Sequence, residues 1–283
     1  ETYNVAVGHG AGLLVTTGIK NTLIGGLAGD AITTGSGNAA VGYNALGATT
    51  TADNLAAFGA LALAANTTGS ENTGLGPAAL YGNTTGTNNV AVGHAALVAN
   101  TTSSNNTAVG KSALGSNTTG TGNVAVGKSA LGANTTANNN VALGLQTLET
   151  NTTGTQNTGL GNYALNNSTT ASNNTAVGYS ALIANTTGTG NSAVGYLTLD
   201  ANTTGNANSA FGGEWTSNAS AALSGNTTGA RNSAFGTGAL AQNTTASYNT
   251  AVGYKSLYAN TTGASNAAFG YSSLSTNTTG ASN

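Results

Sequence analysis

The sequence predicts an all-β protein, a parallel β-solenoid (β-roll) of sixteen coils with seventeen residues each. Two observations predict this fold: a strict period, and a composition in which Gly, Ala, Asn, Thr and Ser dominate while charged residues make up only 4%. Such periods are typical of repeat proteins, in which each unit packs only on its neighbours. Because no apolar spacing of three and four residues persists, helices are not expected.

A glycine that recurs every seventeen residues sets the period. One longer step of twenty-four residues, from Gly212 to Gly236, places a seven-residue insertion loop in the region 213–222. A coil of this length has room for two short strands and their turns. We expect the glycine to form the bend between these strands, because it tolerates positive φ. The glycines are Gly8, Gly25, Gly42, Gly59, Gly76, Gly93, Gly110, Gly127, Gly144, Gly161, Gly178, Gly195, Gly212, Gly236, Gly253 and Gly270.

Two apolar columns predict the core. The residue before each glycine is large and apolar, as at Val7 and Phe269, and the fourth residue after it is Leu in most coils, with Leu223 in this role after the insertion. Small residues, mostly Ala, stand two before and three after the glycine. Since neighbouring side chains in a strand point to opposite faces, we expect the small column to face away from the core, where another backbone can approach it.

Asparagine recurs in two further columns. The first runs from Asn4 to Asn266 and is interrupted only by Leu55, which predicts a stacked amide ladder. In the second column, the asparagine is the first residue of Asn-Thr-Thr. This tripeptide matches the acceptor pattern for N-linked sugar and occurs twelve times. Coils about 4.8 Å apart leave no room for a sugar on each, so we interpret this asparagine as a structural corner. The ladder residues singled out are Asn106, Asn123, Asn117, Asn134, Gly110 and Gly127.

Composition argues against several classes of function. A net charge of −2 offers no electrostatic footprint for nucleic acid, and no apolar run is long enough to span a bilayer, so no membrane insertion is expected within this segment. The absence of Cys excludes thiolate metal sites. His9 and His94 lie five coils apart, and the acidic residues form no cluster. We therefore expect no catalytic, metal or cofactor site, and no enzyme.

Three features are candidate contact surfaces. His94, Lys111 and Lys128 follow the glycine in three consecutive coils and predict either an anion-binding or glycan-binding stripe or a solvated column. The insertion carries Glu214 and Trp215, which predict either an exposed recognition loop or a packing feature at a kink. Tyrosines elsewhere in the column after glycine either contact sugars and proteins or cover small residues beside them. They are Tyr43, Tyr179, Tyr196, Tyr254 and Tyr271.

The units "NTAVGYSAL" (174–182), "NVAVGKSAL" (123–131) and "NSAVGYLTL" (191–199) resemble the head repeats of trimeric autotransporter adhesins. They are also similar to repeats of bacteriophage tail fibres and of large surface proteins of environmental bacteria. The resemblance implies a left-handed β-roll, three of which pack side by side as a homotrimer. It also implies adhesion or binding of a cell-surface receptor or glycan, outside the cell. The adhesin unit is usually shorter, and the difference lies in the "NTTG" segment.

We expect a non-enzymatic extracellular fibre or adhesin rod that presents a repetitive surface for attachment. A bacteriophage tail fibre, a head-to-tail filament and an ice-binding β-solenoid remain open. Thr pairs in every coil favour ice binding, but adjacent Thr side chains point to opposite faces and leave one Thr rank per sheet. We further expect a segment of a longer protein, a single repeat rod over 1–283. In its residues 1–37, Gly12 and Gly29 replace the leucine and indicate an N-terminal cap or a junction with a preceding domain.

Overall fold

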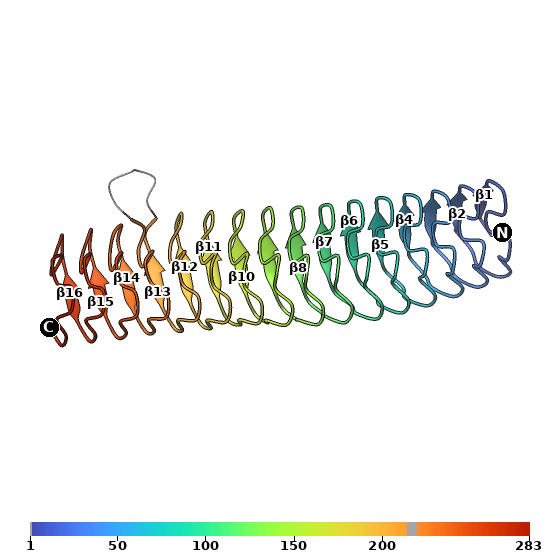
Figure 1. Ribbon diagram of the computed structural model, residues 1–283. Helices are drawn as coiled ribbons and strands as arrows, with labels where there is room; N and C mark the ends of the chain where they lie inside the picture. The colour runs from blue at the N-terminus through green and yellow to red at the C-terminus, as the bar shows by residue number, and fades with distance from the viewer. Residues whose placement is uncertain (1, 214–219) are drawn as a thin grey trace. The chain divides into compact units, whose positions relative to one another are not determined.

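The computed structural model describes residues 2–213 and 220–283. They form two compact units, and the boundary in sequence lies between Asn139 and Asn140. Among the described residues, each unit holds eight three-residue strands and no helix, so no helix could cross a membrane (Figure 1). The first unit has β1 (Val5–Val7), β2 (Thr22–Ile24), β3 (Ala39–Val41), β4 (Ala56–Phe58), β5 (Thr73–Leu75), β6 (Val90–Val92), β7 (Thr107–Val109) and β8 (Val124–Val126). The second has β9 (Val141–Leu143), β10 (Thr158–Leu160), β11 (Thr175–Val177), β12 (Ser192–Val194), β13 (Ser209–Phe211), β14 (Ser233–Phe235), β15 (Thr250–Val252) and β16 (Ala267–Phe269).

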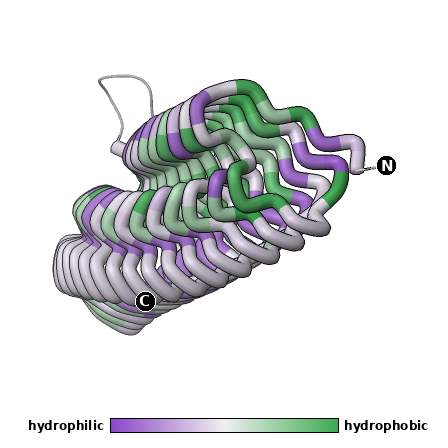
Figure 2. Tube along the Cα trace, turned by 90° about the vertical axis from the view of Figure 1, so that its right-hand side faces the viewer, coloured by the Kyte–Doolittle hydropathy of each residue, from purple (hydrophilic) through white to green (hydrophobic). Residues whose placement is uncertain are grey.

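Within each unit the strands pair in chain order and in parallel. The register follows the period, since Val90 pairs with Thr107 seventeen residues later. Equivalent positions of successive coils therefore lie above one another, and Figure 2 shows similar hydropathy recurring along several of these columns. The predicted all-β parallel β-solenoid is confirmed.

Each coil holds one short strand rather than the two that we expected. After the glycine the chain continues in turns, in which the second and fourth residues have positive φ, as at Ala95 (55°) and Leu97 (50°). These turns still bond to the next coil, because the Leu97 N–H donates to the Ala113 carbonyl at 3.0 Å. The prediction of a second strand was wrong, since stacked turns satisfy the backbone groups in its place.

The recurring glycine has positive φ, as expected, and it also sets how closely the coils approach. Gly110 has φ 133° and Gly127 has φ 135°. A Cβ added to Gly110 would lie 2.6 Å from the Gly127 carbonyl oxygen and 2.7 Å from its carbonyl carbon. These distances are too short for any side chain, so the column after the strand is held in tight backbone contact from coil to coil.

The core contains the small column, which is the reverse of the sequence prediction. The middle residue of every strand from β2 to β16 is buried, and Ala108 and Ala125 are fully buried together with the leucine column, for example Leu114. The large apolar residues that end the strands lie outside, and Phe58 is 41% exposed. The leucine column fills the space that they would need: Leu23, the large mid-strand side chain of β2, is buried where Gly12 and Gly29 lack the leucine, and a Cβ at Gly29 would lie 2.8 Å from it.

The insertion leaves the register of its neighbours intact. The Ala222 N–H donates to the Gly212 carbonyl at 2.8 Å, and β13 pairs with β14 across the twenty-four-residue step, with Ser209 opposite Ser233. Leu223 is fully buried, which confirms its predicted place in the leucine column. The two residues proposed for recognition in this loop, Glu214 and Trp215, lie outside the described residues.

Candidate functional site

The first asparagine column forms a buried ladder, as predicted. The Asn123 side chain donates from Nδ2 to Asn106 Oδ1 at 3.2 Å and to the Ala137 carbonyl at 2.8 Å. The Asn123 backbone N–H also donates to Asn106 Oδ1, at 3.0 Å. Each amide thus binds the coil before it and the coil after it, and both residues are fully buried.

The asparagine of Asn-Thr-Thr forms a second buried ladder. Asn117 Nδ2 donates to the Gly120 carbonyl at 3.0 Å and to Asn100 Oδ1 at 3.2 Å, while Asn134 Nδ2 donates to Asn117 Oδ1 at 2.9 Å. The Gly120 carbonyl also accepts from Asn106 Nδ2 at 2.9 Å, so the two ladders converge on one corner. Asn117 is fully buried, and its amide has no access to a sugar in the folded chain.

The two threonines after this asparagine differ in their surroundings. The hydroxyl of the first one donates to the carbonyl of its equivalent in the next coil, as Thr84 Oγ1 does to Thr101 at 3.0 Å. The second, such as Thr85, is exposed, and in the part of the chain that the structure describes its hydroxyl forms no hydrogen bond. Gly86 is buried and Thr87 is half-buried, so the chain alternates outward and inward here. A second polar column therefore accompanies the exposed threonines.

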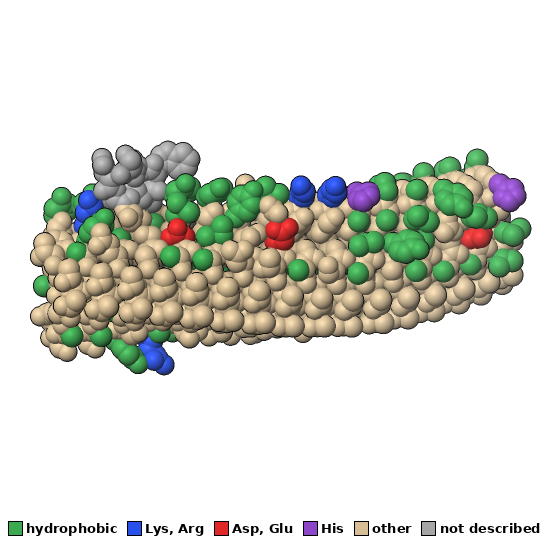
Figure 3. All heavy atoms as spheres, in the orientation of Figure 1, with side chains coloured by type: hydrophobic (Ala, Val, Ile, Leu, Met, Phe, Trp, Pro, Cys, Tyr) green, Lys and Arg blue, Asp and Glu red, His purple; other side chains and the backbone are tan. Residues whose placement is uncertain are grey.

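A continuous apolar column lies on the outside of each unit, and we call it the outer apolar column. It consists of the last residue of every strand, and no outward strand position carries a charge. Figure 3 shows most of the visible hydrophobic side chains in the upper half of the face that it draws. Phe211 and Phe235 stack within it, with ring centroids 5.0 Å apart. Its members are Val7, Ile24, Val41, Phe58, Leu75, Val92, Val109 and Val126 in the first unit, and Leu143, Leu160, Val177, Val194, Phe211, Phe235, Val252 and Phe269 in the second.

The tyrosine column exists in the second unit, but its ring faces are largely used within the chain. Tyr179 stacks on Tyr196 with centroids 5.5 Å apart, and Tyr254 on Tyr271 at 5.4 Å. Tyr163, which the sequence reasoning missed, meets Tyr179 edge to face at 5.7 Å. Each stack covers one face of each of its rings, which leaves fewer open faces for a sugar, although Tyr271 is 80% exposed.

His94, Lys111 and Lys128 are brought together as the sequence predicted, and we call them the cationic stripe. All three side chains are exposed. Backbone bonds hold their positions, since the Ser112 N–H donates to the His94 carbonyl and the Ser129 N–H to the Lys111 carbonyl, each at 3.0 Å. Among the described residues, none of the three side chains forms an ion pair or a hydrogen bond. Figure 3 shows a histidine and two basic side chains in a row along one edge.

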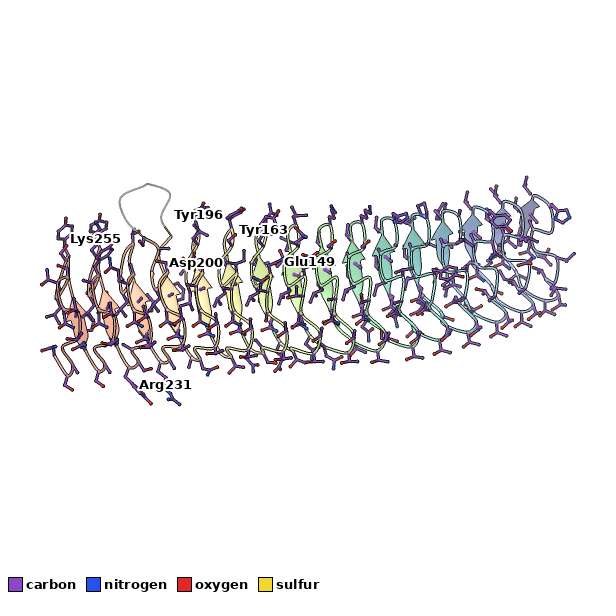
Figure 4. The ribbon with its side chains drawn as sticks, in the orientation of Figure 1. Glu149, Tyr163, Tyr196, Asp200, Arg231 and Lys255 are labelled. Carbon is purple, nitrogen blue, oxygen red and sulfur yellow. The ribbon has the colours of Figure 1, made fainter. Side chains whose placement is uncertain are left out.

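Glu149 and Asp200, the described acidic residues of the second unit, stand on separate coils (Figure 4). Glu149 accepts from Gln146 Nε2 at 2.7 Å and from Asn166 Nδ2 at 3.3 Å. Asp200 lies three coils on, and its Oδ1 is buried without a partner among the described atoms. In the described ranges, no group of three His, Cys, Asp or Glu side chains could hold a metal ion.

Burial raises the pKa of Asp200, and the backbone N–H groups of Asp200 and Ala201 oppose that rise. Because the folded pKa lies above its ordinary value of 3.8, the folded chain binds more protons than the unfolded chain between these two values. The contribution of Asp200 to the free energy of unfolding therefore decreases as the pH rises through this range. An unpaired, partly buried carboxylate is thus a local cost at neutral pH rather than a stabilising feature.

No family model, curated protein or solved structure matches the chain. Function can therefore be inferred only from the surfaces of the two units. Three of them are unexplained by the fold: the outer apolar column, the exposed threonines and the cationic stripe.

Proposed function

We propose that the chain is a non-enzymatic extracellular fibre or adhesin rod whose copies assemble side by side through the outer apolar column. The observation that carries this proposal is that every strand ends in a large apolar side chain pointing outward. Eight of these sixteen side chains are exposed and eight are half-buried, and apolar side chains exposed along one row mark a contact surface. The repeat resemblance supports placement on a bacterial surface or a virion, with tail fibres and adhesins sharing the same rod.

The partner proposed for this column is another copy of the chain. Its apolar side chains recur at the rise of a parallel β-solenoid, about 4.8 Å, and a second copy offers the same spacing. The absence of charge on the outward strand positions means that pairing would bury no unpaired ion. The resemblance to adhesin head repeats favours three copies. This assignment replaces the small column as the lateral contact, because that column is buried within each coil.

The solution mass tests this assembly. We expect light scattering on the purified chain at micromolar concentration to give three times the chain mass of 27.1 kDa. Val92→Asp together with Val126→Asp should reduce it to that of one chain, because two carboxylates in the outer apolar column would have to be buried unpaired.

The matched control is Thr102→Asp with Thr136→Asp, which places the same charges on the same coils at the exposed threonine column. This variant should keep the mass of the unchanged chain. A wild-type chain with the mass of one copy would rule out side-by-side assembly. So would equal masses for the unchanged chain and the Val92→Asp, Val126→Asp variant.

Ice binding is a second candidate, favoured by the exposed threonines. The exposed threonine rank has a polar neighbour, because Thr85 and Thr87 flank the buried Gly86 in outward alternation, and the column of Thr87 carries Thr, Ser or Asn in most coils. The Thr85 hydroxyl, which forms no hydrogen bond among the described residues, is free to hold ordered water, whereas the Thr87 hydroxyl lies 3.3 Å from Ser104 Oγ. We expect thermal hysteresis from the purified chain if this function holds, and its loss when Thr85 and Thr119 are replaced by Tyr. Absence of hysteresis in the unchanged chain would eliminate this candidate.

A further inference from the structure

Positive charge is scarce in this chain and is concentrated in one place. The sequence has five Lys and Arg residues and two His residues, and three of these seven form the cationic stripe. The other basic residues lie far apart in the sequence or have their side chains against tyrosine rings. Arg231 lies 5.4 Å from the centre of the Tyr248 ring, and Lys255 contacts two tyrosine rings. Lys20 stands in a different column.

The scaffold holds the cationic stripe at a fixed spacing. Each of its residues directly follows a recurring glycine, and a Cβ at Gly93 or Gly110 would lie within 2.8 Å of the next coil's backbone. The three positions are thus one coil apart, about 4.8 Å. Like charges at this separation repel, and no carboxylate among the described residues pairs with them. The cationic stripe adds nothing to the stability of the fold. A ligand with matching negative charges would gain binding energy from it.

We infer that the cationic stripe binds a linear sulfated polysaccharide. Sulfate groups accept charge-assisted hydrogen bonds from ammonium groups, and a linear chain can place several of them along one row. Ser112 and Ser129, half-buried beside the stripe, add hydroxyls that suit sugar. Nucleic acid fits less well, because two lysines and one histidine in a chain of net charge −2 form no broad basic face. This inference rests on the proposed function, since it names the molecule to which the rod attaches.

Binding to immobilised heparin, a linear sulfated polysaccharide, tests the inference on the full chain. We expect Lys111→Gln with Lys128→Gln to weaken binding about tenfold or more, because two charge-assisted contacts are lost. The control is Lys20→Gln with Arg231→Gln, which removes the same net charge elsewhere and should bind as the unchanged chain does. The stripe variant should also melt no lower than the unchanged chain, since it loses only repulsion.

Two further matrices identify the ligand class. Neutral dextran should retain none of the proteins, and double-stranded DNA should retain them less than heparin does. Failure of the unchanged chain to bind heparin, equal loss in both variants, or stronger retention on DNA would each overturn the inference. Light scattering on the same samples distinguishes this inference from the proposed assembly. A mass of three chains without binding to heparin would refute only the binding of a sulfated polysaccharide by the cationic stripe.

Discussion

Asn117→Ala should lower the free energy of unfolding by about 2–4 kcal/mol, because it opens a cavity and unpairs groups in a buried amide ladder. The substitution removes the donor to the Gly120 carbonyl and to Asn100 Oδ1, and it removes the acceptor of Asn134 Nδ2. In a repeat protein each coil depends on its neighbours, so the loss should divide one melting transition into two. Thermal and urea unfolding followed by circular dichroism measure both effects.

Thr119→Ala is the matched control, since it removes the same Asn-Thr-Thr pattern while keeping the ladder. Thr119 is exposed, and its replacement should change stability by less than about 0.5 kcal/mol. Both proteins should be made in a host that attaches no N-linked sugar. Equal stability of the two variants would show that Asn117 is not a structural corner, whereas the expected difference assigns the pattern to folding.

Much of the fold could be predicted because the period itself carries the information. A side chain that recurs every seventeen residues must occupy one column in any stacked arrangement, so the leucine core and the asparagine ladder followed from counting. Leu223 is an example, since its sequence spacing to Asn226 placed it correctly in the leucine column in spite of the insertion. The period also placed His94, Lys111 and Lys128 on consecutive coils, and backbone hydrogen bonds join these coils in the structure.

The inside and outside of the strand could not be predicted from the same pattern. Alternation places Ala108 and Val109 on opposite faces but does not say which face is inward. We assigned the larger side chain to the core, as in most proteins, whereas the interior here is already filled by Leu114 and the two asparagines. The prediction of a second strand was wrong for a related reason. Ala95 and Leu97 take left-handed conformations, which their residue types do not suggest.

Gly178→Ala should destabilise the second unit by roughly 3 kcal/mol or more, through both backbone strain and overpacking. Gly178 has φ 134°, outside the left-handed region that other residues of this chain adopt. An added Cβ would clash with the Gly195 carbonyl oxygen and lie 2.7 Å from its carbonyl carbon. Since this neighbour is backbone, no side chain can move aside, and the contact between two coils must open. Chemical unfolding of the purified chain measures the loss.

Gly190→Ala separates tight coil contact from a general need for glycine. Gly190 has φ 67°, close to the values of Asn173 (61°) and Ala207 (55°) at the equivalent position, and an added Cβ would meet nothing within 4 Å. Its replacement should cost only about 1 kcal/mol, the usual penalty of a left-handed alanine. Should the two variants lose the same stability, coil-to-coil contact would not be the reason for the recurring glycine. A larger loss at Gly178 means that the glycine column sets the closest approach of neighbouring coils, and with it the spacing of the outer apolar column.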